Sequence, residues 1–179
     1  MKKVTSVKNI TNPYSKRILS NIINRDPLTV YAKTPHDLQR LLRGLTHQHL
    51  QTPLKKGRWS VAQIVSHLCD AEITMSFRLR MAVAQSGSAL QAYDQDKWAG
   101  ALYYSKANCR EKVKLFSVLR MANVALLKCL SPKEWQRYGM HEERGKETVE
   151  RMVQMLAGHD VNHLKQVEDI RQNFLRKAR

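Results

Sequence analysis

Apolar residues recur every three or four positions along most of this chain, the period of an amphipathic helix rather than of a strand. Their spacing predicts a short helix over 15–24 and longer helices over 34–45, 60–84, 106–130 and 148–174. Nowhere does the sequence sustain the two-residue alternation that half-buried strands show. We therefore predict an all-α fold, a four-helix bundle in which long crossover connections join some of the helices.

Capping residues predict where two of the long helices begin. Thr34 and Pro35 have the pattern of an N-cap followed by a first-turn proline. Ser60 with Gln63 three residues later has the pattern of a capping box, and Trp59 precedes it. These signals predict helix starts at residues 34 and 60.

The segment 85–104 is predicted to be a loop. A length of roughly twenty residues is uncommon for a connection inside a compact domain, and such loops are often functional. The segment carries Tyr93 and Trp98, which could cover a pocket, although core packing is an equally good interpretation of Trp98.

The chain is strongly basic, with 31 Lys and Arg, 15 Asp and Glu, and a net charge of +16. Residues 1–58 hold twelve of the cations and two of the acids. We divide the chain into a basic N-terminal segment, 1–25, that packs on or precedes the bundle, and a bundle domain, 26–175. The charge permits nucleic-acid binding, but no nucleic-acid-binding motif accompanies it, and a solvated basic surface is the simpler explanation.

The three cysteines are widely spaced, odd in number and without a C-x-x-C pair, which argues against a disulfide framework and a cysteine zinc site. The N-terminus lacks the apolar core of a signal peptide, and no apolar run approaches the length of a membrane span. We expect a protein of the reducing cytoplasm with no membrane partner.

Two histidines in the last predicted helix, His159 and His163, are four residues apart, so their imidazoles share one face. At about 100° per residue, His163 lies within about 20° of the apolar direction set by Leu156, and His159 about 60° from it. By the same construction His67 borders the apolar face of the helix over 60–84. Three inward imidazoles are costly unless each is satisfied, and one metal ion would satisfy all three.

Other interpretations of these residues stay open. A single inward histidine is more often a hydrogen-bonded core residue than a ligand. The metallopeptidase motif H-E-x-x-H is not matched, because Asp160 stands in the place of its Glu. Asp160 is better interpreted as a partner that orients an imidazole. Among the other histidines, His141 precedes the last helix and could reach a pocket.

Two runs of the sequence resemble the signature motifs of the DinB/YfiT-like superfamily. Residues 59–72, WSVAQIVSHLCDAE, resemble the pattern W-S-x-x-x-I-x-x-H-L-x-D-x-E, and residues 158–166, GHDVNHLKQ, resemble x-H-D-x-x-H-L-x-Q. Further positions that look similar are 94–99, Arg120, Gly145 and Thr148. The resemblance extends from about Asp26 to Ile170 and covers most of the chain.

The resemblance implies a four-helix bundle whose metal ligands are His67, His159 and His163, with zinc or nickel as the usual ion. Characterised members of the family include S-transferases and an isomerase that use a low-molecular-weight thiol such as bacillithiol or mycothiol. Others are described as metal-dependent hydrolases, and dimers are common. A divalent metal, a thiol cosubstrate and a homodimer are thus what the resemblance implies.

We expect a metal-dependent enzyme, a thiol S-transferase or a related hydrolase, that acts on a small-molecule substrate and recruits anionic molecules through its basic surface. Asp70, Glu72 and Asp160 are candidate catalytic residues, and Arg78 is a further candidate. A salt-bridged helix face is the simpler interpretation of each. The alternatives are a non-catalytic, stress-related metal-binding bundle and a basic nucleic-acid-associated bundle.

Overall fold

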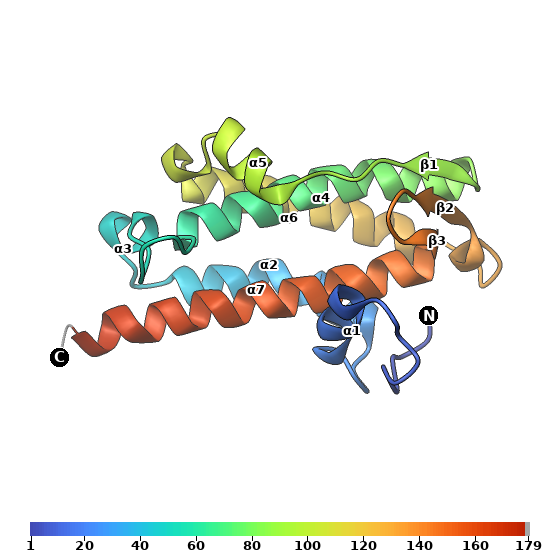
Figure 1. The fold of residues 1–179 in the computed structure, drawn as a ribbon, viewed down its shortest axis with the longest axis horizontal. Helices are drawn as coiled ribbons and strands as arrows, with labels where there is room; N and C mark the ends of the chain where they lie inside the picture. Colours follow the sequence, from blue (N-terminus) through green and yellow to red (C-terminus); the bar gives the residue numbers. More distant parts are fainter. Residues whose placement is uncertain (178–179) are drawn as a thin grey trace.

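The computed structural model describes residues 1–177, and four long helices within this range pack as a four-helix bundle (Figure 1). α2 and α4 each contact both of the other two helices, α6 and α7. The predicted all-α bundle is therefore confirmed. The four helices are α2 (Pro27–Leu42), α4 (Val61–Ala84), α6 (Cys109–Lys128) and α7 (Val149–Lys177).

α4 and α6 run in the same direction. Their bonds join residues whose numbers rise together, since Lys112 contacts Asp70 and Arg120 contacts Glu72. Two parallel neighbours require the chain to return along the bundle between them, and residues 85–108 make that crossover (Figure 1).

The crossover is more ordered than the sequence suggested. Within it lie β1 (Ser88–Leu90), α5 (Gln95–Ala101) and the 3₁₀ turn η1 (Tyr104–Lys106). The prediction of a loop over 85–104 is therefore wrong. Asp94 begins α5 as its N-cap and accepts a hydrogen bond from the backbone N–H of Lys97. The sequence thus carries an N-cap signal at Asp94, but a helix of only 7 residues is too short to show a clear apolar period.

A small sheet closes the end of the bundle at which α7 begins (Figure 1). β2 (Tyr138–His141) and β3 (Gly145–Thr148) pair as an antiparallel hairpin, and β1 pairs in parallel with β2. Strands of 3 and 4 residues are too short to display a two-residue alternation, so the apolar pattern did not reveal them. η2 (Glu134–Gln136) precedes the hairpin.

The start of α2 differs from the prediction. The helix begins at Pro27, and its N-cap Asp26 accepts a hydrogen bond from the backbone N–H of Thr29. Thr34 and Pro35 lie inside the helix. The predicted start at Thr34 is wrong because Asp26 and Pro27 carry the same N-cap and proline signal eight residues earlier.

Proline inside α2 has a structural consequence. Pro35 has no N–H, so the carbonyl oxygen of Tyr31, four residues earlier, lacks its usual helical donor. The guanidinium of Arg120 on α6 donates to that carbonyl instead. The capping box at the start of α4 is confirmed, since Ser60 and Gln63 bond each other's backbone N–H groups.

Two apolar clusters fill the bundle. The first joins the N-terminal segment and α1 (Pro13–Ser20) to the start of α7 and the end of α4. The second joins the start of α4 to the end of α7, near α3 (His47–Gln51). A layer of buried polar side chains from α4, α6 and α7 lies between the two clusters: Asp70, Glu72, Arg120, Asn123, Asp160 and His163.

α1 lies directly against α7 (Figure 1). A Cβ atom on Gly158 would approach the carbonyl oxygen of Ile18 to 2.3 Å, so this glycine permits the close contact. The side-chain amide of Asn21 also donates to the carbonyl of Gly158 at 3.2 Å. The N-terminal segment therefore contacts α7 at Gly158, the residue directly before His159.

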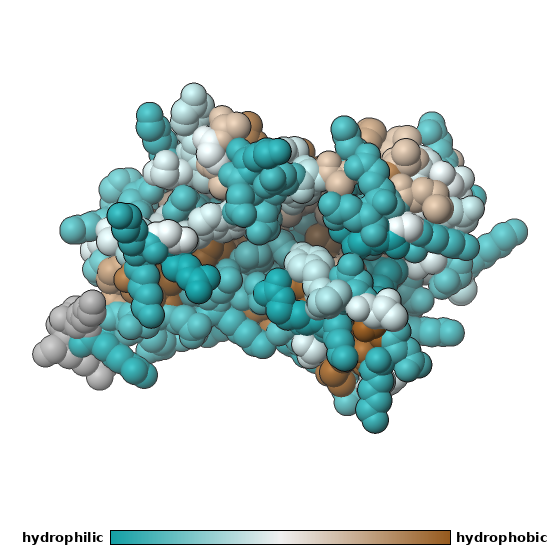
Figure 2. Space-filling model, in the orientation of Figure 1, coloured by the Kyte–Doolittle hydropathy of each residue, from teal (hydrophilic) through white to brown (hydrophobic). Residues whose placement is uncertain are grey.

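The surface in Figure 2 is covered largely by hydrophilic side chains, with smaller apolar areas between them. Within residues 1–177, none of the helices combines the length and apolar character needed to cross a bilayer.

Candidate metal centre

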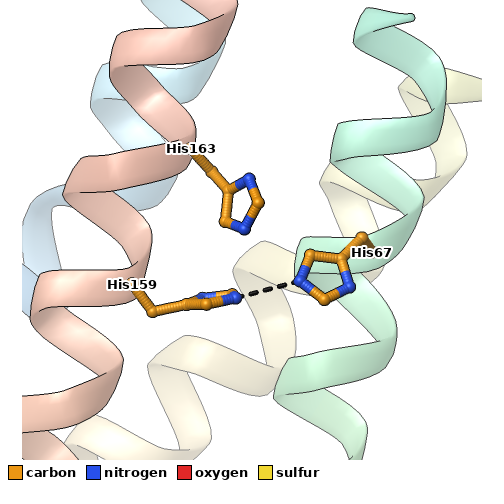
Figure 3. Close-up of side chains that lie close together, drawn as sticks. All are labelled: His67, His159 and His163. Carbon is orange, nitrogen blue, oxygen red and sulfur yellow. Dashed lines mark hydrogen bonds between the residues drawn. The ribbon is translucent and has the colours of Figure 1, made fainter. Parts of the chain in front are cut away.

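Three histidines converge between α4 and α7 (Figure 3). His67 comes from α4, and His159 and His163 are one turn apart on α7. Ring nitrogens of the three lie within 4.8 Å of one another, and Nε2 of His67 is 2.9 Å from Nε2 of His159. The structure thus brings together the three histidines that the sequence selected.

Two of the three histidines are held in the neutral form that metal binding requires. Burial, reinforced by the neighbouring His159, lowers the pKa of His67 to about 2. Burial, again with His159, lowers the pKa of His163 to about 3. Both imidazoles are therefore unprotonated near neutral pH, with a lone pair available.

Hydrogen bonding orients the ring of His163. Its Nδ1 lies 2.8 Å from the side-chain oxygen of Gln166. An amide oxygen only accepts, so Nδ1 carries the proton and Nε2 keeps a lone pair for a metal ion. Nδ1 of His159 lies 3.7 Å from a carboxylate oxygen of Asp160. Gln166 belongs to the second motif noted in the sequence, and orienting a histidine is the role its contact supports.

The donor set fits a divalent ion. Nitrogens bound tetrahedrally at ~2.0–2.1 Å from zinc lie roughly 3.4 Å apart. One observed separation of 2.9 Å and an upper limit of 4.8 Å bracket that spacing. Within residues 1–177, Nδ1 of His67 and Nδ1 of His159 are buried without a hydrogen-bond partner. The Nε2 atoms of the same two rings face each other, and an ion between them would take a lone pair from each.

Behind the histidines, Arg120 holds the polar layer together. This side chain is 1% exposed and donates twice to Glu72, at 3.0 and 2.8 Å, and once to Asp160, at 2.7 Å. Burial opposes its charge, but the carboxylates of Asp160 and Glu72 outweigh burial and raise its pKa. Arg120 in turn overcomes the effect of burial on Asp160 and lowers the pKa of that carboxyl.

The layer is completed by residues that the sequence analysis did not select. The hydroxyl of Tyr31 donates to Glu72 at 2.5 Å, and the amide of Asn123 donates to the same carboxylate at 2.8 Å. Arg120 and Asn123 stand at helical spacing within the otherwise apolar buried stripe of α6. Two polar residues at core positions were the sequence signal that could have identified this layer.

The candidate catalytic carboxylates are engaged elsewhere. Both oxygens of Glu72 bind Arg120, and Asp70 pairs with Lys112 at 3.0 Å. Among residues 1–177, the cluster of metal-binding side chains contains the three histidines alone. Catalytic roles for Asp70, Glu72 and Asp160 stay predictions, and so does the orienting role of Asp160, whose hydrogen bond goes to Arg120.

A cavity of about 360 Å³ opens beside His67 and His159. Tyr93 lines it from the crossover segment, stacked on Trp98 at a ring distance of 4.3 Å. His141 of β2 lines the same cavity, as expected from its place before α7. Side chains from α1, α4 and the hairpin complete the wall, among them Tyr14, Arg17, Arg78 and Arg144.

Comparison with known proteins shows what the chain is similar to. It is 26% identical over 152 residues to a protein of Oceanobacillus iheyensis named "Putative metal-dependent hydrolase", with 85% of this chain and 88% of that protein covered. A Bacillus mycoides protein of the same description is 26% identical over 140 residues, 78% of this chain and 80% of its own.

Among solved structures, the chain is similar to YfiT from Bacillus subtilis, described as a probable metal-dependent hydrolase with an unusual four-helix bundle topology. The TM-score is 0.77 at 22% identity, over 83% of this chain and 85% of that one, which establishes the shared fold. The family model described as the DinB superfamily matches residues 31–167, a span that contains all three histidines. The chain therefore belongs to the DinB superfamily.

Proposed function

We propose that the chain is a metal-dependent enzyme of the thiol S-transferase kind. His67, His159 and His163 would hold a divalent ion, zinc or nickel, next to the cavity that takes a low-molecular-weight thiol and a small electrophile. The observation that carries this proposal is the convergence of three imidazoles, whose ring nitrogens lie within 4.8 Å of one another, beside a cavity of about 360 Å³. Three protein ligands leave a coordination position for a reactant, the arrangement of catalytic rather than structural sites.

When bound, such an ion supplies Lewis acidity, which lowers the pKa of a coordinated thiol or water. A thiol suits the residues present because its ordinary pKa of about 8.5 requires little further help to ionise near neutral pH. Glu72 and Asp160 are bound to Arg120 and are therefore poorly placed to act as a general base for water. These contacts favour a thiol as the nucleophile.

In the proposed reaction the thiol proton leaves to solvent, and the sulfur forms a bond to an electrophilic carbon. The bond between that carbon and its leaving group breaks, and the leaving group departs with the electron pair. The residues of the chain would position the reactants: His67 and His159 line the cavity on one side, and Tyr93, stacked on Trp98, lines it from the crossover.

Hydrolysis is the second candidate, with water in place of the thiol. The names of the relatives from Oceanobacillus iheyensis and Bacillus mycoides support it. The two candidates share the metal centre and differ in the nucleophile, so one set of assays separates them.

The experiment measures metal content by mass spectrometry, followed by turnover of an electrophilic aryl halide with several thiols and of an ester with water. Wild-type protein is expected to carry about one divalent ion per chain, and His67→Ala, His159→Ala and His163→Ala each to lose it. His36→Ala is the matched control, because His36 lies on the surface of α2 with 71% of its side chain exposed.

Retention of the full metal content by His163→Ala would refute the three-histidine assignment. Thiol turnover that needs the metal supports the S-transferase proposal. Ester turnover alone would support the hydrolase, and a fully loaded protein that turns over neither class would favour a non-catalytic metal-binding role.

A further inference from the structure

His141 presents a hydrogen-bond donor that lacks an acceptor. Its side chain is 3% exposed, and its Nδ1 accepts the backbone N–H of Glu143 at 3.2 Å. Burial, with the charge of Arg144, lowers the pKa of His141, so the ring is neutral and its single proton lies on Nε2. Within residues 1–177, this buried Nε2 has no hydrogen-bond partner. The residue lines the cavity beside the three histidines.

Arg78 brings a cation to the same cavity. It is 6% exposed, donates to the carbonyl of Gln91 and contacts the sulfur of Met75 at 3.7 Å. Among the ion pairs of residues 1–177, none joins Arg78 to a carboxylate, although a guanidinium has five donors to satisfy. The ring of Tyr93 lies 5.8 Å from the guanidinium carbon and offsets part of the cost of burying this charge. With no carboxylate bonded to it, the position still favours an anion.

The charges around the cavity also favour an anion. Arg17, from α1, and Arg144, from the hairpin, line it together with Arg78. Glu147 is matched by Arg144 through two bonds of 2.8 and 2.9 Å. The remaining lining carboxylate, Glu143, is exposed. Two arginines therefore face one exposed carboxylate, and the cavity is positive overall.

We infer that this cavity contains an oxyanion subsite in which the Nε2–H of His141 and the guanidinium of Arg78 bind a carboxylate of the substrate. The inference rests on the proposed function and specifies its substrate class: a small organic acid, anchored by its carboxylate at this end, whose reactive carbon extends toward His67 and His159. A phosphate monoester offers the same oxyanion chemistry and is distinguished by the test. Charge-assisted bonds from a donor such as an arginine are about twice as strong as neutral ones, so loss of either group is measurable.

The test is calorimetric titration of the metal-free full-length protein with benzoate, succinate and inorganic phosphate. None of the subsite residues is a metal ligand, so binding is expected without an ion. His141→Phe keeps a planar ring but removes the donor, and Arg78→Met keeps the stem but removes the charge. Each is expected to weaken carboxylate binding by about tenfold or more, the loss typical of a hydrogen bond to a charged group.

Two controls keep the inference falsifiable. His141→Gln restores a donor and is expected to recover most of the affinity that His141→Phe loses. Arg40→Met removes one cation from an exposed position on α2, with 62% of the side chain accessible, and is expected to leave binding within twofold. A loss equal to that of Arg78→Met would show that net charge, not the subsite, attracts the anion.

The outcomes also separate this inference from the proposed function. Failure of all three anions to bind, or unchanged affinity in both cavity variants, would overturn the subsite even if metal and turnover are normal. Tighter binding of phosphate than of either carboxylate would overturn the assignment to an organic acid. Loss of metal-dependent turnover with intact anion binding would refute the proposed function and leave the subsite standing.

Discussion

Replacing Arg120 by methionine tests how much of the stability depends on one buried cation. The side chain is 1% exposed and lies between the rings of Tyr31 and Phe116, with its guanidinium carbon 3.6 and 4.6 Å from their centroids. Methionine keeps a flexible stem of similar length. It removes the charge and the donors that reach Glu72, Asp160 and the free carbonyl of Tyr31.

The expected loss follows from what is left behind. Glu72 and Asp160 are each about 1% exposed and would remain buried without a counter-charge. Breaking one buried ion pair by removing one partner typically costs about 3–5 kcal/mol. Arg120 serves two carboxylates, so we expect a loss of at least about 4 kcal/mol, a large part of the roughly 5–15 kcal/mol available to a typical domain.

The assay is urea unfolding of the metal-free protein followed by far-ultraviolet circular dichroism. A shifted midpoint at constant slope reports the change in the free energy of unfolding. The triple variant Arg120→Met, Glu72→Gln, Asp160→Asn removes the unpaired charges and should recover a substantial part of the loss. Arg40→Met, on the surface, should change stability by less than about 0.5 kcal/mol. A loss below about 1 kcal/mol for Arg120→Met, or no recovery in the triple variant, would refute the reasoning.

Three further predictions concern the packing of α1, the histidines and the surface. Gly158→Ala should destabilise the protein, because the contact of the new Cβ with Ile18 opposes a helix-propensity gain of about 1 kcal/mol; a rise in the thermal midpoint would contradict this. The lowered pKa values of His67 and His163 mean that the unfolded metal-free chain binds more protons below pH ~6.5. Stability should therefore be flat above that pH and fall on acidification, by up to about 1.4 kcal/mol per pH unit for each residue, and urea unfolding of His67→Phe should show a shallower fall. We propose that a homodimer forms through the exposed apolar side chains of α4 and α6, among them Phe77, which is 66% exposed; light scattering should find Phe77→Lys monomeric, and a monomeric wild type would contradict the proposal.

The histidine cluster was predictable because periodicity and the family motifs identified the same residues. The i, i+4 spacing fixes His159 and His163 on one face of α7, and His67 borders the core face of α4 in the same arithmetic. The helical arithmetic suggested joining His67 to His159, 92 positions away, and the resemblance then matched all three histidines to one ligand pattern.

The remaining features depend on tertiary contacts that periodicity does not encode. The orphaned carbonyl of Tyr31 matters only because Arg120 lies opposite it, and the β hairpin is too short for a pattern. The wall of the cavity combines α1 with the hairpin, and no local sequence signal joins Arg17 to His141. Such positions emerge only when the elements are packed together.

The division of the three histidines between α4 and α7 constrains when the centre can form. Ribosomal synthesis proceeds from the N-terminus, so His67 is made long before His159 and His163, and α7 follows every other helix of the bundle. Binding of one ion by all three histidines would therefore have to await docking of α7 against α4. Imidazole ligands accept several transition metals, so the ion that such a centre takes up would depend on which divalent metal is available when α7 docks as much as on the geometry of the ligands.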